Sequence, residues 1–231
     1  MKLLTLIPWT DALAVVWFLA VWLGYAWYSR RRRDLDTTLL AVTNRYRRLW
    51  MMQATARDPR MLDGLIMQGL SGSPAFFASA SMLVIGGVMA LLGTSDQAAE
   101  LVRDIPFAVQ ASKALLEVKM LLLGGIFVFA FFRFSWSMRQ YTFAALMVGA
   151  MPPPEDFASG KVDREHYAER AGKLVGMAAE TFNDGIRAYY FAFAAIAWFL
   201  SPLALAVAAA AVAWVLYMRE YRSHVLQVLR D

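Results

Sequence analysis

Four long apolar stretches restrict the possible folds of this chain more than any other feature. They run over residues 9–28, 75–93, 114–132 and 188–217 and carry few or no charges. A bilayer core about 30 Å thick needs about 20 apolar residues in a helix, so each stretch is long enough to cross a membrane. The fourth stretch is too short for two crossings and a turn. We therefore expect one long helix there, kinked or tilted at Ser201 and Pro202.

Composition agrees with a membrane protein and excludes several kinds of site. Hydrophobic residues make up 59% of the chain and charged residues 18%, against about 45–50% and about 25% in soluble domains. Cysteine is absent, so disulfides, iron–sulfur clusters and thiolate metal sites are excluded. Both histidines, His166 and His224, lie outside the apolar stretches, and we predict no metal and no cofactor.

The basic residues predict how the chain is oriented. Residues 29–74 hold nine arginines and residues 133–187 hold seven basic residues, whereas the other connections and the tails hold three or fewer each. The positive-inside rule places both long loops in the cytoplasm and both termini outside, in the inner (plasma) membrane of a bacterium. It also accounts for the net charge of +5 without a nucleic-acid partner.

The long loops, residues 29–74 and 133–187, have helical rather than linker patterns. Apolar residues recur at helical spacing from Leu35 onward, and a second short helix is expected over 60–70. Asp163 is a plausible N-cap of a further amphipathic helix, with Gly185 as its stop. The third span meets no turn signal before Pro152, so we expect it to project into the cytoplasm. The predicted fold is an all-α integral membrane protein, a single membrane domain over residues 1–231 with four transmembrane helices, amphipathic cytoplasmic helices and a long third helix.

Three strings of residues resemble a known family. ARDPRMLDGLIMQGLSGSPAFFAS, FRFSWSMRQYTF and FNDGIRAYYFAFAAIAWF are similar to sequences of the bacterial domain of unknown function 599. The resemblance covers roughly residues 57–199. It implies a multi-spanning membrane protein and supplies no activity.

Glu117 and Lys119 are the candidate pathway residues. A charge at the centre of a transmembrane helix costs about 2.5–3.5 kcal/mol on insertion scales, so such residues are functional candidates. Two positions apart on a helix, they point in different directions and cannot simply neutralise each other. The structural alternative is an interfacial pair of Lys113 with Glu117 and a Lys119 that snorkels to the surface.

A second group of polar residues lies at the predicted inner ends of the third and fourth spans. Its members are Arg133, Arg139, Gln140, Asn183 and Arg187. Arg133 and Gln140 are seven apart and share a helix face. The group could line an inner vestibule or bind an anion or a lipid phosphate, and ordinary anchoring at the inner leaflet is the alternative.

These features favour an oligomeric channel or solute pathway as the leading functional hypothesis. Small residues in the second, third and fourth spans permit close helix packing, either within one subunit or between subunits. A homo-oligomer is expected because a four-span chain of this size is small. The alternative is a non-conducting accessory or scaffold subunit that binds another membrane complex or anionic lipid head groups at the cytoplasmic face. An enzyme is not expected, because the nucleotide-binding, metalloprotease and serine-hydrolase motifs are absent.

Overall fold

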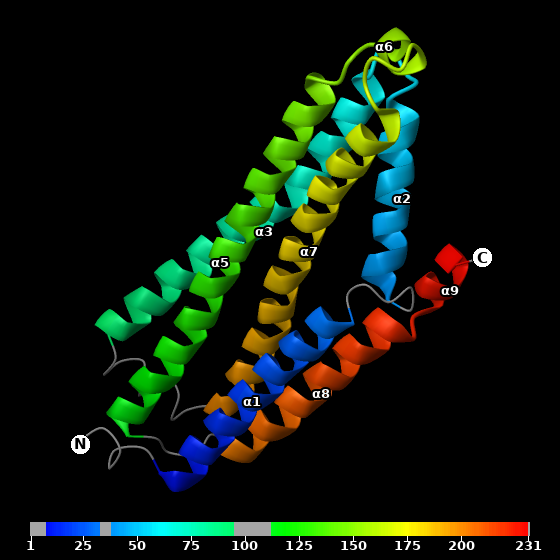
Figure 1. Cartoon of the computed structure of the whole chain (residues 1–231). Coiled ribbons are helices and arrows are strands. Elements are labelled where there is room, and N and C mark those ends of the chain that lie inside the picture. Colours follow the sequence, from blue (N-terminus) through cyan, green and yellow to red (C-terminus); the bar gives the residue numbers. More distant parts are fainter. Residues whose placement is uncertain (1–7, 33–37, 95–111, 231) are drawn as a thin grey trace. The chain divides into compact units, whose positions relative to one another are not determined.

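The computed structural model describes residues 8–32, 38–94 and 112–230, and all regular structure in these ranges is helical (Figure 1). In chain order the elements are α1 (Trp9–Arg31), α2 (Leu39–Ala54), α3 (Met61–Gly93), α5 (Lys113–Gly149), α6 (Pro154–Ala158), α7 (Arg164–Ile196), the 3-10 turn η1 (Ala197–Phe199), α8 (Pro202–Tyr221) and α9 (His224–Arg230). Residue 35, where the sequence predicts the start of the first loop helix, lies outside the described ranges, and α2 begins at Leu39.

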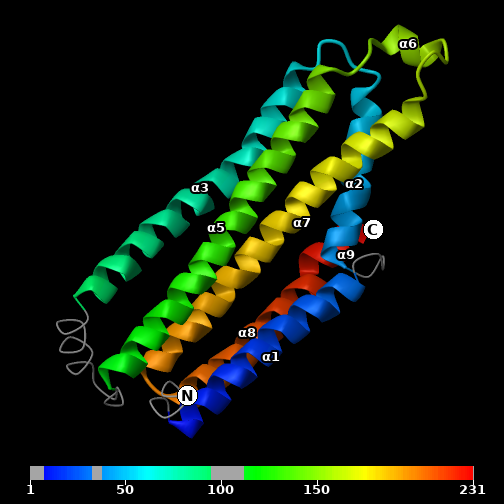
Figure 2. The same ribbon diagram turned by 60° about the vertical axis from the view of Figure 1, so that its left-hand side comes forward.

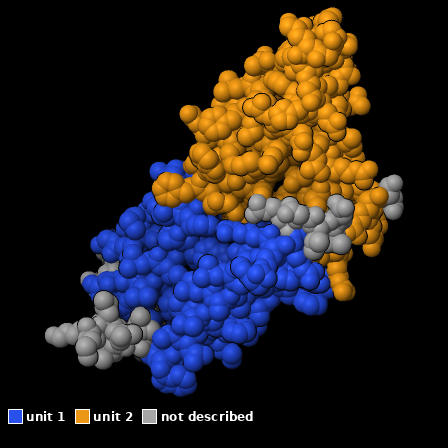
Figure 3. Space-filling model, viewed as in Figure 1, with its two compact units in different colours: residues 1–32, 80–131, 186–219 blue, residues 33–79, 132–185, 220–231 orange. Residues whose placement is uncertain are grey.

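The chain divides into two compact units, coloured separately in Figure 3. Unit 1 comprises residues 1–32, 80–131 and 186–219, and unit 2 comprises residues 33–79, 132–185 and 220–231. The helices α3, α5, α7 and α8 contribute residues to both. A compact unit is not by itself an independent domain, so the single membrane domain stays a prediction.

Four helices are long and apolar enough to cross a membrane, which confirms the predicted fold class in its coarse form. They lie within Trp9–Arg31, Met61–Gly93, Lys113–Gly149 and Pro202–Arg230. α5 is one continuous helix of 37 residues. At 1.5 Å per residue it is roughly 55 Å long, well beyond an apolar core of about 30 Å.

The second span starts earlier than the sequence suggested. The expected short helix over 60–70 is not a separate element, because α3 runs without a break from Met61 through Pro74 to Gly93. The residue four positions before Pro74, Leu70, loses one backbone hydrogen bond, since proline has no N–H.

The fourth predicted span, residues 188–217, is wrong as a single helix. α7 ends at Ile196, and α8 begins at Pro202. The hydroxyl of Ser201 accepts a hydrogen bond from the backbone N–H of Ala204 at 3.0 Å, so Ser201 caps α8. Proline at the first helical position completes a standard helix start. The apolar residues before it are the end of the long helix that begins at Arg164.

Side-chain contacts give the directions of α1, α7 and α8 in unit 1. α1 and α8 lie side by side in Figures 1 and 2 and run parallel, because Trp17 contacts Ala206 and Tyr28 contacts Tyr217. α7 runs antiparallel to both. At one end of α1, Ser29 accepts from Arg187 at 2.7 Å, and at the other end Asp11 accepts from Trp198 at 2.8 Å.

Unit 2 has its own core, formed by α2, α7 and the adjoining parts of α3 and α5. Its buried residues are Met51, Met67, Tyr141, Ala144, Val148, Ala168, Ala171, Val175 and Ala178. α2 and α7 pack with their backbones in near contact, because a Cβ added to Gly172 would lie 2.9 Å from the Cα of Arg48. Asp163 caps α7 as predicted, its carboxylate accepting from the N–H of His166 at 3.0 Å.

Gly185 does not stop a helix, since α7 continues through it. A Cβ at this position would lie 2.5 Å from Cε1 of Phe134. Phe134 is fully buried and its ring contacts those of Phe77 and Phe182. Gly185 is therefore required for close packing of α7 on α5.

Candidate functional site

Two charged residues in unit 1 are buried and are joined through one tryptophan. The indole nitrogen of Trp198 donates to Oδ1 of Asp11 at 2.8 Å, and Nζ of Lys119 donates to the carbonyl oxygen of Trp198 at 2.8 Å. Only 5% of Asp11 and 3% of Lys119 is exposed. The carbonyl belongs to the last turn of α7 and η1, where helix carbonyls lack partners within the helix, so Lys119 caps this helix end.

This arrangement gives Glu117 and Lys119 different environments, as their two-residue spacing implied. Glu117 is half-buried, whereas Lys119 is buried and also lies 5.4 Å from the centroid of the Trp198 ring. Lys119 therefore does not snorkel to the surface, contrary to the structural alternative. The lysine is held by a carbonyl and an aromatic ring within the protein.

Arginine and aromatic side chains gather at the opposite end of unit 1, where α1 and α8 end. The guanidinium carbon of Arg31 lies 4.3 Å from the centroid of Trp27, and that of Arg219 lies 4.9 Å from the centroid of Tyr190. Arg219 also donates to the hydroxyl of Tyr190 at 3.0 Å. We call this set, with the buried Arg187, the arginine–aromatic end.

Arg187 is the most buried arginine of this end. It donates to the hydroxyl of Ser29 at 2.7 Å, and its guanidinium carbon lies 5.8 Å from the centroid of Tyr25. Both contacts are with α1, so Arg187 fixes the beginning of the unit 1 part of α7 on the end of α1. Of the five residues in the predicted inner group, Arg187 alone belongs to unit 1.

The other members of that group, Arg133, Arg139, Gln140 and Asn183, belong to unit 2. Arg133 forms an ion pair with Asp184 of α7. One helical turn further along α5, Ser137 donates to the carbonyl of Ala178 at 2.7 Å. The polar row predicted from Arg133 to Gln140 thus packs against α7.

Two atoms of this row are buried without a hydrogen-bond partner in the described part of the chain, namely Nε of Arg133 and Oε1 of Gln140. In the described part of the chain, Arg139 and Asn183 form no hydrogen bond with this row. Arg139 is exposed and its guanidinium lies 5.3 Å from the centroid of Phe143, while Asn183 is half-buried.

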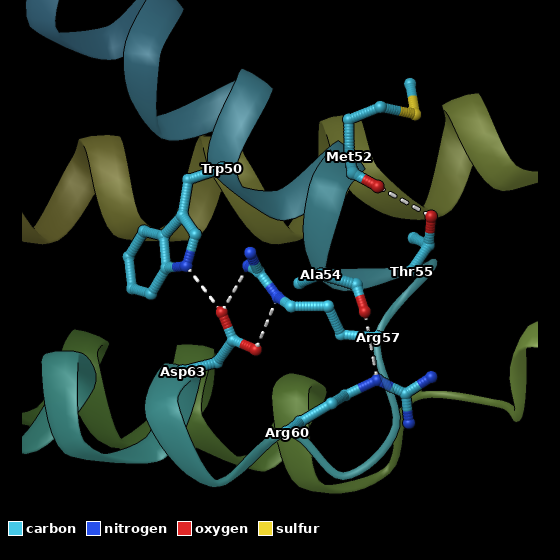
Figure 4. Close-up of polar contacts among 7 residues, drawn as sticks. All are labelled: Trp50, Met52, Ala54, Thr55, Arg57, Arg60 and Asp63. Carbon is cyan, nitrogen blue, oxygen red and sulfur yellow. Dashed lines mark hydrogen bonds and ion pairs between the residues drawn. The ribbon is translucent and has the colours of Figure 1, made fainter.

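A second polar cluster in unit 2 lies at the connection between α2 and α3, and Figure 4 shows its side chains converging on one carboxylate. Asp63 is fully buried and accepts from the indole of Trp50 at 2.7 Å. It also accepts from Arg57 through two nitrogens, at 2.6 and 3.2 Å. The connection includes a cis peptide bond between Asp58 and Pro59.

Neighbouring side chains tie this connection to the end of α5. Arg60 donates to the backbone carbonyls of Ala54, Met151 and Pro152 at 2.6–3.1 Å. Tyr167 donates to the carbonyl of Met147 at 2.7 Å. Burial raises the pKa of the Tyr167 hydroxyl, and the nearby Arg170 and Arg60 partly offset that effect. The cluster is saturated by internal bonds, and this points to a structural role.

Sequence reasoning missed Asp11, Trp198 and Asp63 as members of polar clusters. Asp11 was detectable in principle, because it is the only acidic residue in the first apolar stretch. The partner role of Trp198 leaves no local signal, since the residue it binds is 187 positions away. Asp63 lies within one of the strings that resemble the family, but its spacing to Arg57 is not a recognised helical pair.

Comparison with known proteins places this chain in a family. The family described as "Protein of unknown function, DUF599" matches residues 13–225, nearly the whole chain. No curated protein matches the chain, and no solved structure matches it. The described fold, with four helices able to span a membrane, agrees with the multi-spanning architecture that the resemblance implied. The chain belongs to this family of proteins of unknown function, DUF599.

Proposed function

We propose that this protein is a non-conducting accessory subunit of the bacterial inner membrane that binds anionic phospholipid head groups through its arginine–aromatic end. The observation that carries the proposal is the placement of Arg31, Arg187 and Arg219, from three different helices, beside aromatic rings at one end of unit 1.

Stacking on an aromatic ring orients a guanidinium without using its in-plane donors. Arg31 is held in this way on Trp27, whereas Arg219 lies beside the Tyr190 ring and uses one of its five N–H groups to donate to the tyrosine hydroxyl. Arginine presents its N–H groups in a planar fork that matches two phosphate oxygens. Tryptophan, tyrosine and arginine are also the residues enriched where lipid head groups meet the hydrocarbon core. The end is therefore suited to hold a lipid phosphate.

The polar residues at the other end of unit 1 support an accessory role over a channel. Asp11 and Lys119 are both buried, and Trp198 bridges them. Charged residues within membrane spans commonly mark ion pathways, whereas these groups are engaged in joining α1, α5 and η1. A channel remains the competing function and would have to form between subunits.

Lipid binding is tested by native mass spectrometry of protein released from nanodiscs that contain phosphatidylcholine with phosphatidylglycerol or cardiolipin. We expect the wild type to retain anionic lipid. Each basic residue near an anionic surface contributes about 1 kcal/mol, so Arg31→Gln with Arg219→Gln should weaken retention by about thirtyfold. The matched control is Arg164→Gln with Lys173→Gln, two exposed basic residues of α7 in unit 2.

Conduction is tested separately by ion flux into liposomes that contain the purified protein. The accessory function predicts flux no higher than in protein-free liposomes. Flux that depends on the protein and changes in Glu117→Gln would overturn the proposal and favour the channel. If the lipid-site variant and its control lose equal amounts of lipid, the loss is due to the lower total positive charge, and a specific site at the arginine–aromatic end is refuted.

A further inference from the structure

An open groove of about 350 Å³ lies between α2 and α7 in unit 2. One wall is a single face of α2, where the residues are spaced as neighbours on a helix surface. The other wall is the first part of α7. The residues that line the groove are Arg45, Arg48, Leu49 and Met52 of α2 and Glu165, Ala168 and Glu169 of α7.

The two walls carry opposite charge. Arg45 and Arg48 are exposed on the α2 wall, and Glu165 and Glu169 are exposed on the α7 wall. Within residues 38–94 and 112–230, none of these four side chains enters an ion pair or hydrogen bond. The charges are therefore available to an external partner.

The floor between the charged walls is apolar. Leu49 is 49% exposed there, and Met52 and Ala168 lie on either side of the line where the two helices meet. The walls are also fixed, because the backbone of α2 reaches contact with α7 at Gly172. A groove with an apolar floor and rigid charged edges is suited to a protein surface.

We propose that a second copy of this chain docks on this groove and forms a two-fold symmetric dimer. In such a dimer the same patch is used by both copies. The two-fold axis of this dimer runs along the groove, parallel to its walls, so a residue on one wall meets the opposite wall of the partner. A two-fold axis through the Leu49 region sets the arginines of each copy against the glutamates of the other. A surface that is positive on one side and negative on the other is thereby complementary to itself. This inference stands independently of lipid binding.

Charge reversal tests the pairing directly. In the variant Arg45→Glu with Arg48→Glu, the α2 wall of each copy becomes negative and faces the negative α7 wall of the other copy. In the variant Glu165→Arg with Glu169→Arg, both facing walls are positive. Each variant should lower the fraction of dimer in detergent by about tenfold or more, as measured by native mass spectrometry, since like charges across an interface strongly disfavour association. Co-expression of the two variants with different affinity tags should restore a mixed dimer, because both contacts then join opposite charges.

The mixed dimer separates loss of the interface from loss of folding, because a misfolded variant cannot be rescued by its counterpart. Arg139→Glu with Arg222→Glu makes the same change of charge at exposed positions outside the groove and should leave the dimer intact. A wild-type protein that is monomeric in both detergent and nanodiscs refutes the proposal. The proposal is also refuted if neither charge reversal affects the dimer, or if the two co-expressed variants form no mixed dimer. A different protein that binds the wild type and is lost from the variants refutes it as well.

Discussion

The indole nitrogen of Trp198 donates a hydrogen bond of 2.8 Å to Oδ1 of Asp11, which lies 187 positions earlier in the chain. This bond joins η1, the turn that follows α7, to the start of α1. Because the backbone carbonyl of the same tryptophan accepts from Lys119, one residue connects three helices of unit 1. Its loss should affect the fold of that unit more than the loss of any exposed aromatic ring.

Trp198→Phe should lower the stability of the detergent-purified protein by about 1–3 kcal/mol, because the variant leaves the buried Asp11 carboxylate without its indole donor. The measurement is the apparent melting temperature, followed as loss of the monodisperse peak after heating. The matched control is Trp214→Phe in α8, where the side chain is 61% exposed. An equal fall in both variants would show that ring size, and not the bond to Asp11, determines the effect.

The direction of α8 predicts where the C-terminus lies. α8 runs parallel to α1, so its last residues lie at the same end of unit 1 as the arginines that end α1. If both helices cross the membrane, the apolar part of α7 must cross between α5 and α8, and the positive-inside rule then places the C-terminus in the cytoplasm and the N-terminus outside. A fluorescent-protein fusion at the C-terminus should therefore fluoresce, and an alkaline phosphatase fusion there should be inactive.

A reporter inserted after Gly160 should also read as cytoplasmic, as the arginine count in the long loops predicts. An active phosphatase at the C-terminus together with a cytoplasmic reading at Gly160 would mean that α7 and α8 together make one crossing. That result would restore the topology with both termini outside. The wild-type fusions need a matched measurement of protein amount in the membrane fraction.

The sequence predicted elements whose signals are local and missed those that depend on distant partners. The first three apolar stretches and the Asp163 cap follow from local patterns, and the structure contains them. Ser201 and Pro202 also form a local helix-start signal. Because residues 188–217 are too short for two crossings and a turn, the sequence predicts one kinked or tilted helix there, whereas α7 begins at Arg164. The partners of Lys119 and Arg133, in contrast, come from helices far along the chain.

Gly185→Ala should destabilise the protein by about 1–3 kcal/mol, because the added methyl group would overlap the ring of Phe134. That ring is fully buried against two other phenylalanines and cannot move freely. Gly69→Ala on α3 is the control, since nothing lies within 4 Å of its Cβ position. Alanine there should be neutral or stabilising by up to about 1 kcal/mol. Melting temperatures of the two variants that change in the same direction would contradict the packing assigned to Gly185.

Asp63→Asn should destabilise the protein by about 1–3 kcal/mol, because it leaves a donor of the buried cluster without its acceptor, while the Arg57 side chain is 39% exposed and can still be solvated. The carboxylate is fully buried and accepts from both Trp50 and Arg57, so an amide there must turn an N–H group toward one of these donors. The connection between α2 and α3 should loosen, and limited proteolysis should then cut near Arg57 and Arg60 faster than in the wild type.

Asp156→Asn supplies the matched control, since Asp156 pairs with Lys161, whose side chain is 71% exposed. Exposed pairs contribute about 0–1 kcal/mol, so the control should keep its melting temperature and its cleavage rate. Similar behaviour of the two variants would show that the Asp63 carboxylate does not hold this connection together.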